Sequence, residues 1–239
     1  MSRTIIFIAT MSIQVTNFHS QIVSTTQPAA ATVVTSDSVA LFLPTNVVGS
    51  TWNDSSTYGN HLTLSNTSYA NNELTFDSSK YAFAFRNAIT GTPRSQMTIT
   101  AWVKSASVAS IAYLFSLNRW SSNNLQEMVV ELDYNLYKFW DYSDAYSYNT
   151  AINVPIISNT YYQITFVKNG KSGRYYLNGS LANSVSSNTD VVYGSSYFCI
   201  GKDYRNNNAY FNGKLKFFGM YNRALSAEEI VQNYQAMLS

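Results

Sequence analysis

The residues with the clearest potential for chemistry are Glu127, Glu131, Asp133 and Asn135, in the segment EMVVELDYN. The apolar residues among them predict a β-strand, in which residues two apart lie on the same face. Glu131, Asp133 and Asn135 therefore share one face, and Glu127 lies further along it. Two carboxyl groups about 5 Å apart are what retaining glycoside hydrolysis requires, so this row is the candidate for acid–base catalysis. Its alternative role is a solvated strand face.

A second set of residues is suited to binding sugars. Aromatic side chains stand beside Asn, Ser and Asp in two segments, NRWSSNN and FWDYSDAYSYN. The C–H face of a sugar ring stacks on an exposed aromatic plane, while nearby polar side chains reach its hydroxyl groups. In a chain with 19 Tyr, the alternative role of an aromatic residue is to cover a strand. The candidate carbohydrate-binding residues are Trp120, Trp140, Tyr142, Tyr146 and Tyr148.

The composition favours an exposed β protein and argues against several other classes. Aromatic residues make up 15% of the chain and charged residues only 12%. The formal net charge of +2 comes from scattered residues, 15 basic and 13 acidic, so nucleic acid is not expected as a partner. No segment has the length and apolarity of a membrane span. Cys199, the single cysteine, is predicted to be a buried thiol. Because the chain has only this cysteine and two histidines, His19 and His61, the usual zinc sites are excluded.

Strands joined by polar turns must position these residues. The pairs Asn169-Gly170 and Asn178-Gly179 supply the positive φ angles that tight hairpins require. Met97–Val103 alternates between two sets of side chains, so one of its faces must be core. Further strands are predicted over Val39–Leu43, Leu62–Leu64, Glu73–Phe76, Tyr81–Phe85, Tyr113–Leu117, Glu127–Asp133, Leu136–Trp140 and Tyr197–Gly201.

The last element is predicted to be a short amphipathic helix. Ser226 and Glu229 form a capping box at its start. A helix of this length has marginal stability alone, so we expect it to dock against the strands. Its apolar stripe contains Leu225, Ile230, Tyr234 and Met237.

Five segments, taken in order, carry a family resemblance. They are WNDSSTYGNHLTL at Trp52–Leu64, LTFDSSKYAF at Leu74–Phe83, MTITAWVK at Met97–Lys104, YYQITFVKNGKSGRYYLNGSL at Tyr161–Leu181, and IGKDYRNNNAYFNGKLKFFGMYNRALSAEEIVQNY at Ile200–Tyr234. The set resembles a laminin G-like domain of the concanavalin A-like lectin/glucanase superfamily. The resemblance implies an all-β fold, a two-sheet antiparallel jelly-roll sandwich, to which the sequence pattern adds a short C-terminal helix and an N-terminal extended arm. Trp102, in ITAWVK, resembles the family's core tryptophan.

The resemblance extends to the strand that carries the acidic residues. ELDYN resembles the E-x-D-x-E strand of laminarinase-type glycoside hydrolases, in which the first Glu is the nucleophile and the last is the acid/base. Asn135 stands at the last position, and an amide cannot donate and recover a proton. Glu127 lies roughly 13 Å from Glu131 along an extended strand. We therefore predict that the chain is not an enzyme.

A calcium ion is also implied by the resemblance. Many relatives hold one Ca²⁺ through an Asp side chain and backbone carbonyls near the sandwich rim, and Ca²⁺ prefers such oxygen ligands in irregular loops. Asp54 and Asp203 are the first candidate ligands, and Asp77 is another. Each of the three also has an ordinary role as an Asx turn or a cap.

Residues 1–36 are predicted to precede the domain, which spans residues 37–239. Arg3 followed by the apolar run from Ile5 imitates a signal peptide, but Thr10 and Ser12 interrupt that run. The alternative is an extended arm that adds a strand to a neighbouring subunit's sheet.

Two function classes follow from these features. The first is a non-catalytic carbohydrate-binding or adhesion module on a cell or particle surface, with a glycan or glycoprotein as its partner. The second is a structural virion protein, as minor capsid, decoration or fibre component, whose N-terminal arm contacts other particle subunits. Both place the chain outside cells or on a particle surface.

Overall fold

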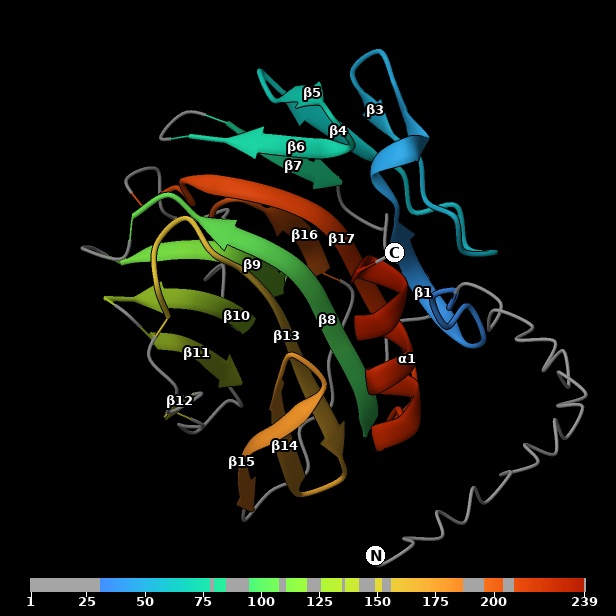
Figure 1. Cartoon of the computed structure of the whole chain (residues 1–239), viewed down its shortest axis with the longest axis vertical. Helices are drawn as coiled ribbons and strands as arrows, with labels where there is room; N and C mark the ends of the chain where they lie inside the picture. Colours follow the sequence, from blue (N-terminus) through green and yellow to red (C-terminus); the bar gives the residue numbers. More distant parts are fainter. Residues whose placement is uncertain are drawn as a thin grey trace, which may run out of the picture.

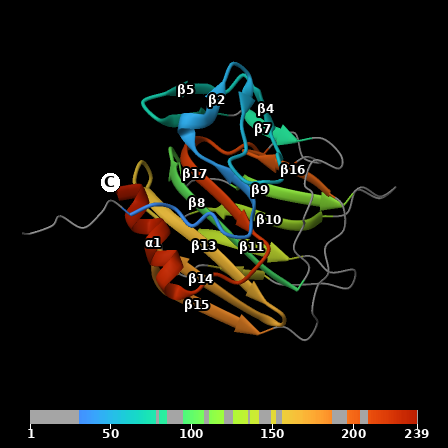
Figure 2. The ribbon, with the colours of Figure 1, turned by 90° about the vertical axis from the view of Figure 1, so that its right-hand side faces the viewer.

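The structure is a computed structural model that describes residues 31–77, 80–84, 95–107, 111–119, 126–134, 136–141, 149–151, 156–186, 196–203 and 209–238. These residues form two antiparallel sheets that pack face to face, with one α-helix against the outer side of the first sheet (Figure 1 and Figure 2). The all-β, two-sheet jelly-roll sandwich with a short C-terminal helix, which the sequence predicted, is confirmed. No helix in the described part of the chain is long and apolar enough to cross a bilayer.

The first sheet has eight strands. Seven of them follow the order β15-β14-β13-β8-β17-β6-β5, and β1 also pairs with β17. Strands β1 and β6 pair with opposite ends of β17. The strands are β1 (Ser38–Phe42), β5 (Ser68–Ala70), β6 (Glu73–Phe76), β8 (Gln96–Ser105), β13 (Tyr161–Asn169), β14 (Ser172–Leu177), β15 (Ser180–Ser186) and β17 (Gly213–Tyr221).

The second sheet has nine strands in the order β12-β11-β10-β9-β16-β7-β4-β3-β2. A short 3₁₀ turn, η1 (Pro44–Asn46), joins β1 of the first sheet to the edge of the second. The strands are β2 (Val47–Val48), β3 (Thr51–Trp52), β4 (Leu62–Ser65), β7 (Tyr81–Ala84), β9 (Ala112–Arg119), β10 (Gln126–Asp133), β11 (Leu136–Asp141), β12 (Asn149–Ala151) and β16 (Ser196–Ile200).

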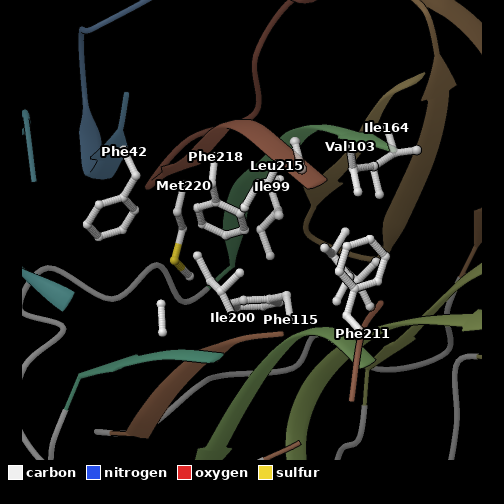
Figure 3. Close-up of a cluster of buried hydrophobic side chains, with 14 of the residues drawn as sticks. Phe42, Ile99, Val103, Phe115, Ile164, Ile200, Phe211, Leu215, Phe218 and Met220 are labelled. Atoms are coloured by element: carbon white, nitrogen blue, oxygen red, sulfur yellow. The ribbon is translucent and has the colours of Figure 1, made fainter. Parts of the chain in front are cut away.

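The main core lies between the two sheets. Phe218 and Ile99 of the first sheet point toward Phe115 and Ile200 of the second (Figure 3). The ring of Phe198 lies 5.0 Å from that of Phe115 and 5.4 Å from that of Phe218, between centroids. Burying such rings is the largest favourable contribution that strands of this composition make to folding.

Strand β8 is buried on both faces. Ile99, Ala101 and Val103 belong to the inter-sheet core, as strand alternation predicts. Thr98 and Trp102 face the other way and are also buried, because α1 (Ala227–Leu238) and the chain before it cover that side. The ring of Trp102 lies 5.4 Å from that of Tyr234 on the helix. The packing role predicted for Trp102 is therefore confirmed, under the helix rather than between the sheets.

The two hairpins β13–β14 and β14–β15 close with different turns. Asn178 and Gly179 both have positive φ angles, 50° and 78°, and form the two-residue loop between Leu177 and Ser180, as predicted. In the other hairpin Asn169 pairs with Ser172, so the loop is Gly170-Lys171, and Gly170 has a φ of 56°. The turn thus lies one residue later than the Asn-Gly pair suggested, with glycine at its first position.

The capping box of α1 is confirmed by both of its hydrogen bonds. The backbone N–H of Glu229 donates to Ser226 Oγ at 3.3 Å, and that of Ser226 donates to Glu229 Oε2 at 2.9 Å. Arg223 holds the same carboxylate through two hydrogen bonds, of 2.6 and 2.7 Å. The hydrogen bonds from Arg223 lower the pKa of Glu229 more than burial raises it.

The helix also holds the segment that precedes β1. Val34 N–H donates to Asn233 Oδ1 at 2.7 Å, and Gln232 Nε2 donates to the carbonyl of Thr32 at 2.7 Å. Tyr221 Oη donates to the carbonyl of Val34 at 2.8 Å. Asn233 is fully buried, and its side chain joins the helix to Val34 and to Tyr221.

Candidate functional site

The acidic residues of β10 lie on the outer face of the second sheet. Val130 and Leu132 point into the inter-sheet core, so Glu131 and Asp133 point away from it. Glu131 is opposite Tyr113 on β9 and Lys138 on β11. Cross-strand neighbours share a face, which places a tyrosine, two carboxylates and an ammonium group side by side.

Two more tyrosines and a lysine extend this face toward β7. The segment at Tyr210 bridges to Tyr113, and the ring of Tyr210 lies 6.2 Å from that of Tyr81 at the start of β7. Lys202 Nζ lies 4.2 Å from the centroid of Tyr81 and 5.6 Å from that of Tyr210. The ammonium group is thus held by two aromatic faces, an attraction of about 0.5 to 2 kcal/mol per ring.

These residues form two groups, one across β9, β10 and β11 and one at the start of β7 and after β16, and the backbone bridge between Tyr113 and Tyr210 links them. We call the whole set the tyrosine–carboxylate row. Its members are Tyr81, Tyr113, Glu131, Asp133, Lys138, Lys202 and Tyr210. Half-buried rings offer apolar planes, carboxylates accept hydrogen bonds from hydroxyl groups, and ammonium groups donate them. This is the division of labour that sugar sites use.

Several charged side chains of the row are shielded from water. Glu131 is only 7% exposed and Lys202 also 7%, and Lys138 forms an ion pair with Asp133. Charges interact more strongly where water is excluded. Cys199, on the neighbouring strand β16, is fully buried, and burial raises the pKa of its thiol to about 12. The predicted buried thiol is confirmed.

Asp54 has a structural role in this fold. Its Oδ1 accepts the backbone N–H groups of Leu41 (2.7 Å) and Ser56 (2.8 Å). Its Oδ2 accepts Ser56 Oγ (2.5 Å) and the N–H of Asn60 (2.8 Å). Four donors use the acceptor positions of the carboxylate, so this arrangement does not fit a calcium ligand at Asp54.

The other two calcium candidates, Asp203 and Asp77, differ in their surroundings. Asp203 is 2% exposed, and Asp77 forms an ion pair of 3.0 Å with Lys80. Among the residues that the structure describes, no three His, Cys, Asp or Glu side chains form a metal-binding group. Calcium binding stays a prediction.

Most of the aromatic residues predicted to bind carbohydrate lie outside the residues that the structure describes. Trp120, Tyr142, Tyr146 and Tyr148 lie outside the described residues. Trp140 is in β11, opposite Val129, and its side chain is not described. Asn135 and residues 1–30, on which the arm and its contacts to other subunits depend, also lie outside the description. These predictions stay open.

The tyrosines and lysines of the row were not singled out from the sequence. Tyr113 is next to Tyr210 only because two segments about a hundred residues apart meet at the end of β9. The acidic residues of β10 were the signal in the sequence that pointed to this site, because residues opposite them on the neighbouring strands belong to it.

A family model described as the concanavalin A-like lectin/glucanases superfamily, of laminin G-like type, matches residues 56–231. This is well over half of the chain. The chain belongs to that superfamily. The resemblance stated from the sequence is thereby confirmed, and the matched region contains the whole tyrosine–carboxylate row. A comparison with curated proteins gives no match.

Solved structures with the same fold include parts of larger proteins. Trypanosoma rangeli sialidase in complex with sialic acid has a TM-score of 0.65 at 19% identity, over 87% of this chain and 34% of that one. The receptor binding domain of botulinum neurotoxin C/D mosaic serotype has a TM-score of 0.70 at 13% identity, over 86% and 52%. The binding domain of botulinum neurotoxin serotype G gives 0.63 at 18%, over 84% and 51%.

The lectin/glucanase chain thus spans about a third of the sialidase and half of the toxin domains. These matches correct one prediction. Asn135 led us to predict that the chain is not an enzyme, and the sialidase matches contradict that prediction, because this fold is part of a chain that is a glycoside hydrolase. A single amide at position 135 is too narrow a basis for excluding catalysis, since acids can come from other strands of the face.

Proposed function

We propose that this lectin/glucanase domain binds carbohydrate on the outer face of its second sheet, outside the cell. One observation carries the proposal: three partly exposed tyrosines lie among two carboxylates and two ammonium groups on that face. Glycans combine apolar C–H faces with hydroxyl groups, and the row offers partners for both. Membership in the superfamily and the named sialic acid complex of the sialidase support the same ligand class.

The first test is a glycan array with the purified protein, run with calcium and with a chelator. The best ligand is then titrated by calorimetry. Reproducible binding by the wild type is expected, and loss on chelation would support the calcium prediction. An array without any binder would contradict the proposal.

Variants then test whether the row is the binding site. Tyr81→Ala removes a stacking plane and should weaken binding about tenfold, whereas Tyr81→Phe keeps the ring and should bind as the wild type does. Glu131→Gln keeps the shape but loses a charged acceptor, with an expected loss of tenfold or more. Tyr134→Ala, at a residue 62% exposed in the β10–β11 turn, is the matched control. Wild-type affinity in both Tyr81→Ala and Glu131→Gln would place the site elsewhere.

A second candidate function is glycoside hydrolysis at the same row. The observation that favours it is that Glu131 is nearly buried beside Asp133 on one strand face. Residues two apart on a strand are about 7 Å apart, within the range of about 6.5–9.5 Å that inverting hydrolysis uses. Product formation from the bound glycan, followed by mass spectrometry, tests it. Glu131→Gln and Asp133→Asn should each lower such a rate at least a hundredfold.

A further inference from the structure

Three lysines gather on the outer face of the first sheet, beside α1. Lys104 is on β8, and Lys214 and Lys216 are on β17; we call them the lysine cluster. They surround the ring of Tyr161 on β13. Lys104 Nζ lies 4.6 Å and Lys216 Nζ 4.8 Å from its centroid. This cluster is on the opposite sheet from the tyrosine–carboxylate row, so it is a separate feature of the molecule.

A β-bulge brings the third lysine to this face. Leu215 pairs with Val103 and Phe217 pairs with Trp102, so Lys216 is an extra residue in β17. Lys214 is opposite Lys104. Bulges re-aim side chains and are common next to functional sites. Without the extra residue, strand alternation would give this end of β17 one lysine fewer on the outer side.

Glu73 is the single carboxylate that the described residues place in this cluster. Its Oε2 accepts Lys214 Nζ at 2.6 Å, and its Oε1 accepts Tyr161 Oη at 2.7 Å and lies 3.8 Å from Lys216 Nζ. Burial raises the pKa of Glu73, but these hydrogen bonds and the charges of Lys214 and Lys104 lower it further than burial raises it. Glu73 is thus ionised at neutral pH, and one negative charge stands against three positive ones.

The excess positive charge remains accessible to a ligand. The side chains of Lys214 and Lys216 are 39% and 35% exposed, whereas that of Glu73 is 12% exposed. The lysine side chains are therefore more exposed than the carboxylate that pairs with them. Such an arrangement concentrates positive potential over a small area and attracts an anion.

The surroundings narrow the class of anion. The ring of Tyr161 already contacts two ammonium groups and stacks on Trp102 at 6.3 Å, so it offers no plane for a nucleobase, which single-stranded nucleic acid sites require. Electrostatic binding to an anionic membrane takes about four to eight basic residues, more than this cluster has. Lysines act as point charges without the fixed fork of arginine, which suits sulfate or carboxylate groups spaced along a flexible sugar chain.

We propose that the lysine cluster is a second binding site of this domain, for the sulfate or carboxylate groups of an acidic polysaccharide. It goes beyond the proposed function, because it lies on the other sheet and requires neither the tyrosines nor the carboxylates of the row.

The test uses the full chain and dextran sulfate oligosaccharides, with unsulfated dextran of the same length as the comparison. Affinity is measured at low, physiological and high salt. Lys104→Gln combined with Lys216→Gln should weaken binding of the sulfated probe about tenfold. The control combines Lys171→Gln with Arg174→Gln, two exposed residues of the β13–β14 hairpin, and should change binding less than twofold.

A variant that is expected to strengthen binding makes the test stricter. Glu73→Gln removes the neutralising charge, so binding of dextran sulfate should become several-fold tighter. A purely structural role of Glu73 would instead weaken binding or leave it unchanged. Thermal unfolding of each variant shows that it is folded at the assay temperature.

Other outcomes would overturn the proposal. Equal losses in the cluster variant and the hairpin control would mean general charge attraction. Polyglutamate or single-stranded DNA bound more tightly than dextran sulfate would assign the cluster to another class of partner. Carboxymethyl dextran in a further arm distinguishes carboxylate from sulfate as the preferred group.

Discussion

The outer faces of the two sheets are built from the same pleated strands, yet they differ in what covers them. On the first sheet, Thr98 and Trp102 are buried beneath α1 and the chain before it. On the second, Glu131 and Tyr113 lie in a row of polar and aromatic residues that the helix does not reach (Figure 2). The helix therefore completes the fold on the first face, with the lysine cluster at its margin, whereas the second face carries charged and aromatic side chains that the helix does not cover.

The largest expected effect is at Trp102, at the centre of the covered face. Trp102→Ala removes a ring that packs on Tyr161 and Tyr234, and should lower the free energy of unfolding by about 3–5 kcal/mol. Urea denaturation measures this, with Tyr134→Ala as the exposed control. If the variant loses glycan affinity while it is still folded, the covered face of the first sheet and the outer face of the second are coupled, and the two faces do not have separate roles.

A smaller loss is expected at Asn233. Asn233→Ala leaves the N–H of Val34 without its acceptor and takes one hydrogen bond from Tyr221. The free energy of unfolding should fall by about 1–3 kcal/mol. Gln235→Ala, at an exposed position of the same helix, should have almost no effect. An equal loss in both variants would mean that the buried hydrogen bonds of Asn233 do not decide the result.

The cap of α1 should matter less. Ser226→Ala removes the hydroxyl that accepts the N–H of Glu229 and should cost about 1 kcal/mol of stability. Ser184→Ala, on the exposed strand β15, serves as the control in the same denaturation series. Glycan binding should be the same in the wild type and in Ser226→Ala, because the cap lies on the covered face.

The smallest effect concerns pH. The hydrogen bonds from Arg223 lower the pKa of Glu229 in the folded state. A depressed pKa contributes stability above the unfolded-state value and loses it as pH falls through the folded-state value. Wild type should therefore lose up to about 1 kcal/mol more than Glu229→Gln between pH 7 and pH 3, measured by denaturation at each pH. An identical pH dependence in both proteins would mean that the ion pair between Arg223 and Glu229 does not contribute to stability.

Local signals in the sequence predicted local structure well. The capping box at Ser226 and the turn at Asn178-Gly179 depend on neighbouring residues, so spacing alone was sufficient. Alternation in β8 predicted two faces but did not show that both are buried, because the cover of Trp102 comes from more than a hundred residues further along the chain. The Gly170-Lys171 turn was displaced by one residue because the pairing of Asn169 with Ser172 fixes the loop.

The candidate site could be predicted only in part, for a similar reason. Glu131 and Asp133 were found because they alternate on one strand. Tyr81, Tyr210 and Lys202 come together through strand order and an isolated bridge, and no spacing in the sequence encodes that. Asn233 was not singled out from the sequence, because its hydrogen-bond partners Val34 and Tyr221 come from other segments of the chain.

The contacts of Thr32 and Val34 with α1 have a consequence for how this domain is combined with others. They bring the described start of the polypeptide, at residue 31, to the helix that forms its described end. A domain whose two ends meet can be inserted into a loop of a host protein without stretching either partner. It can also be circularly permuted, with new ends cut at an exposed turn such as Gly170-Lys171.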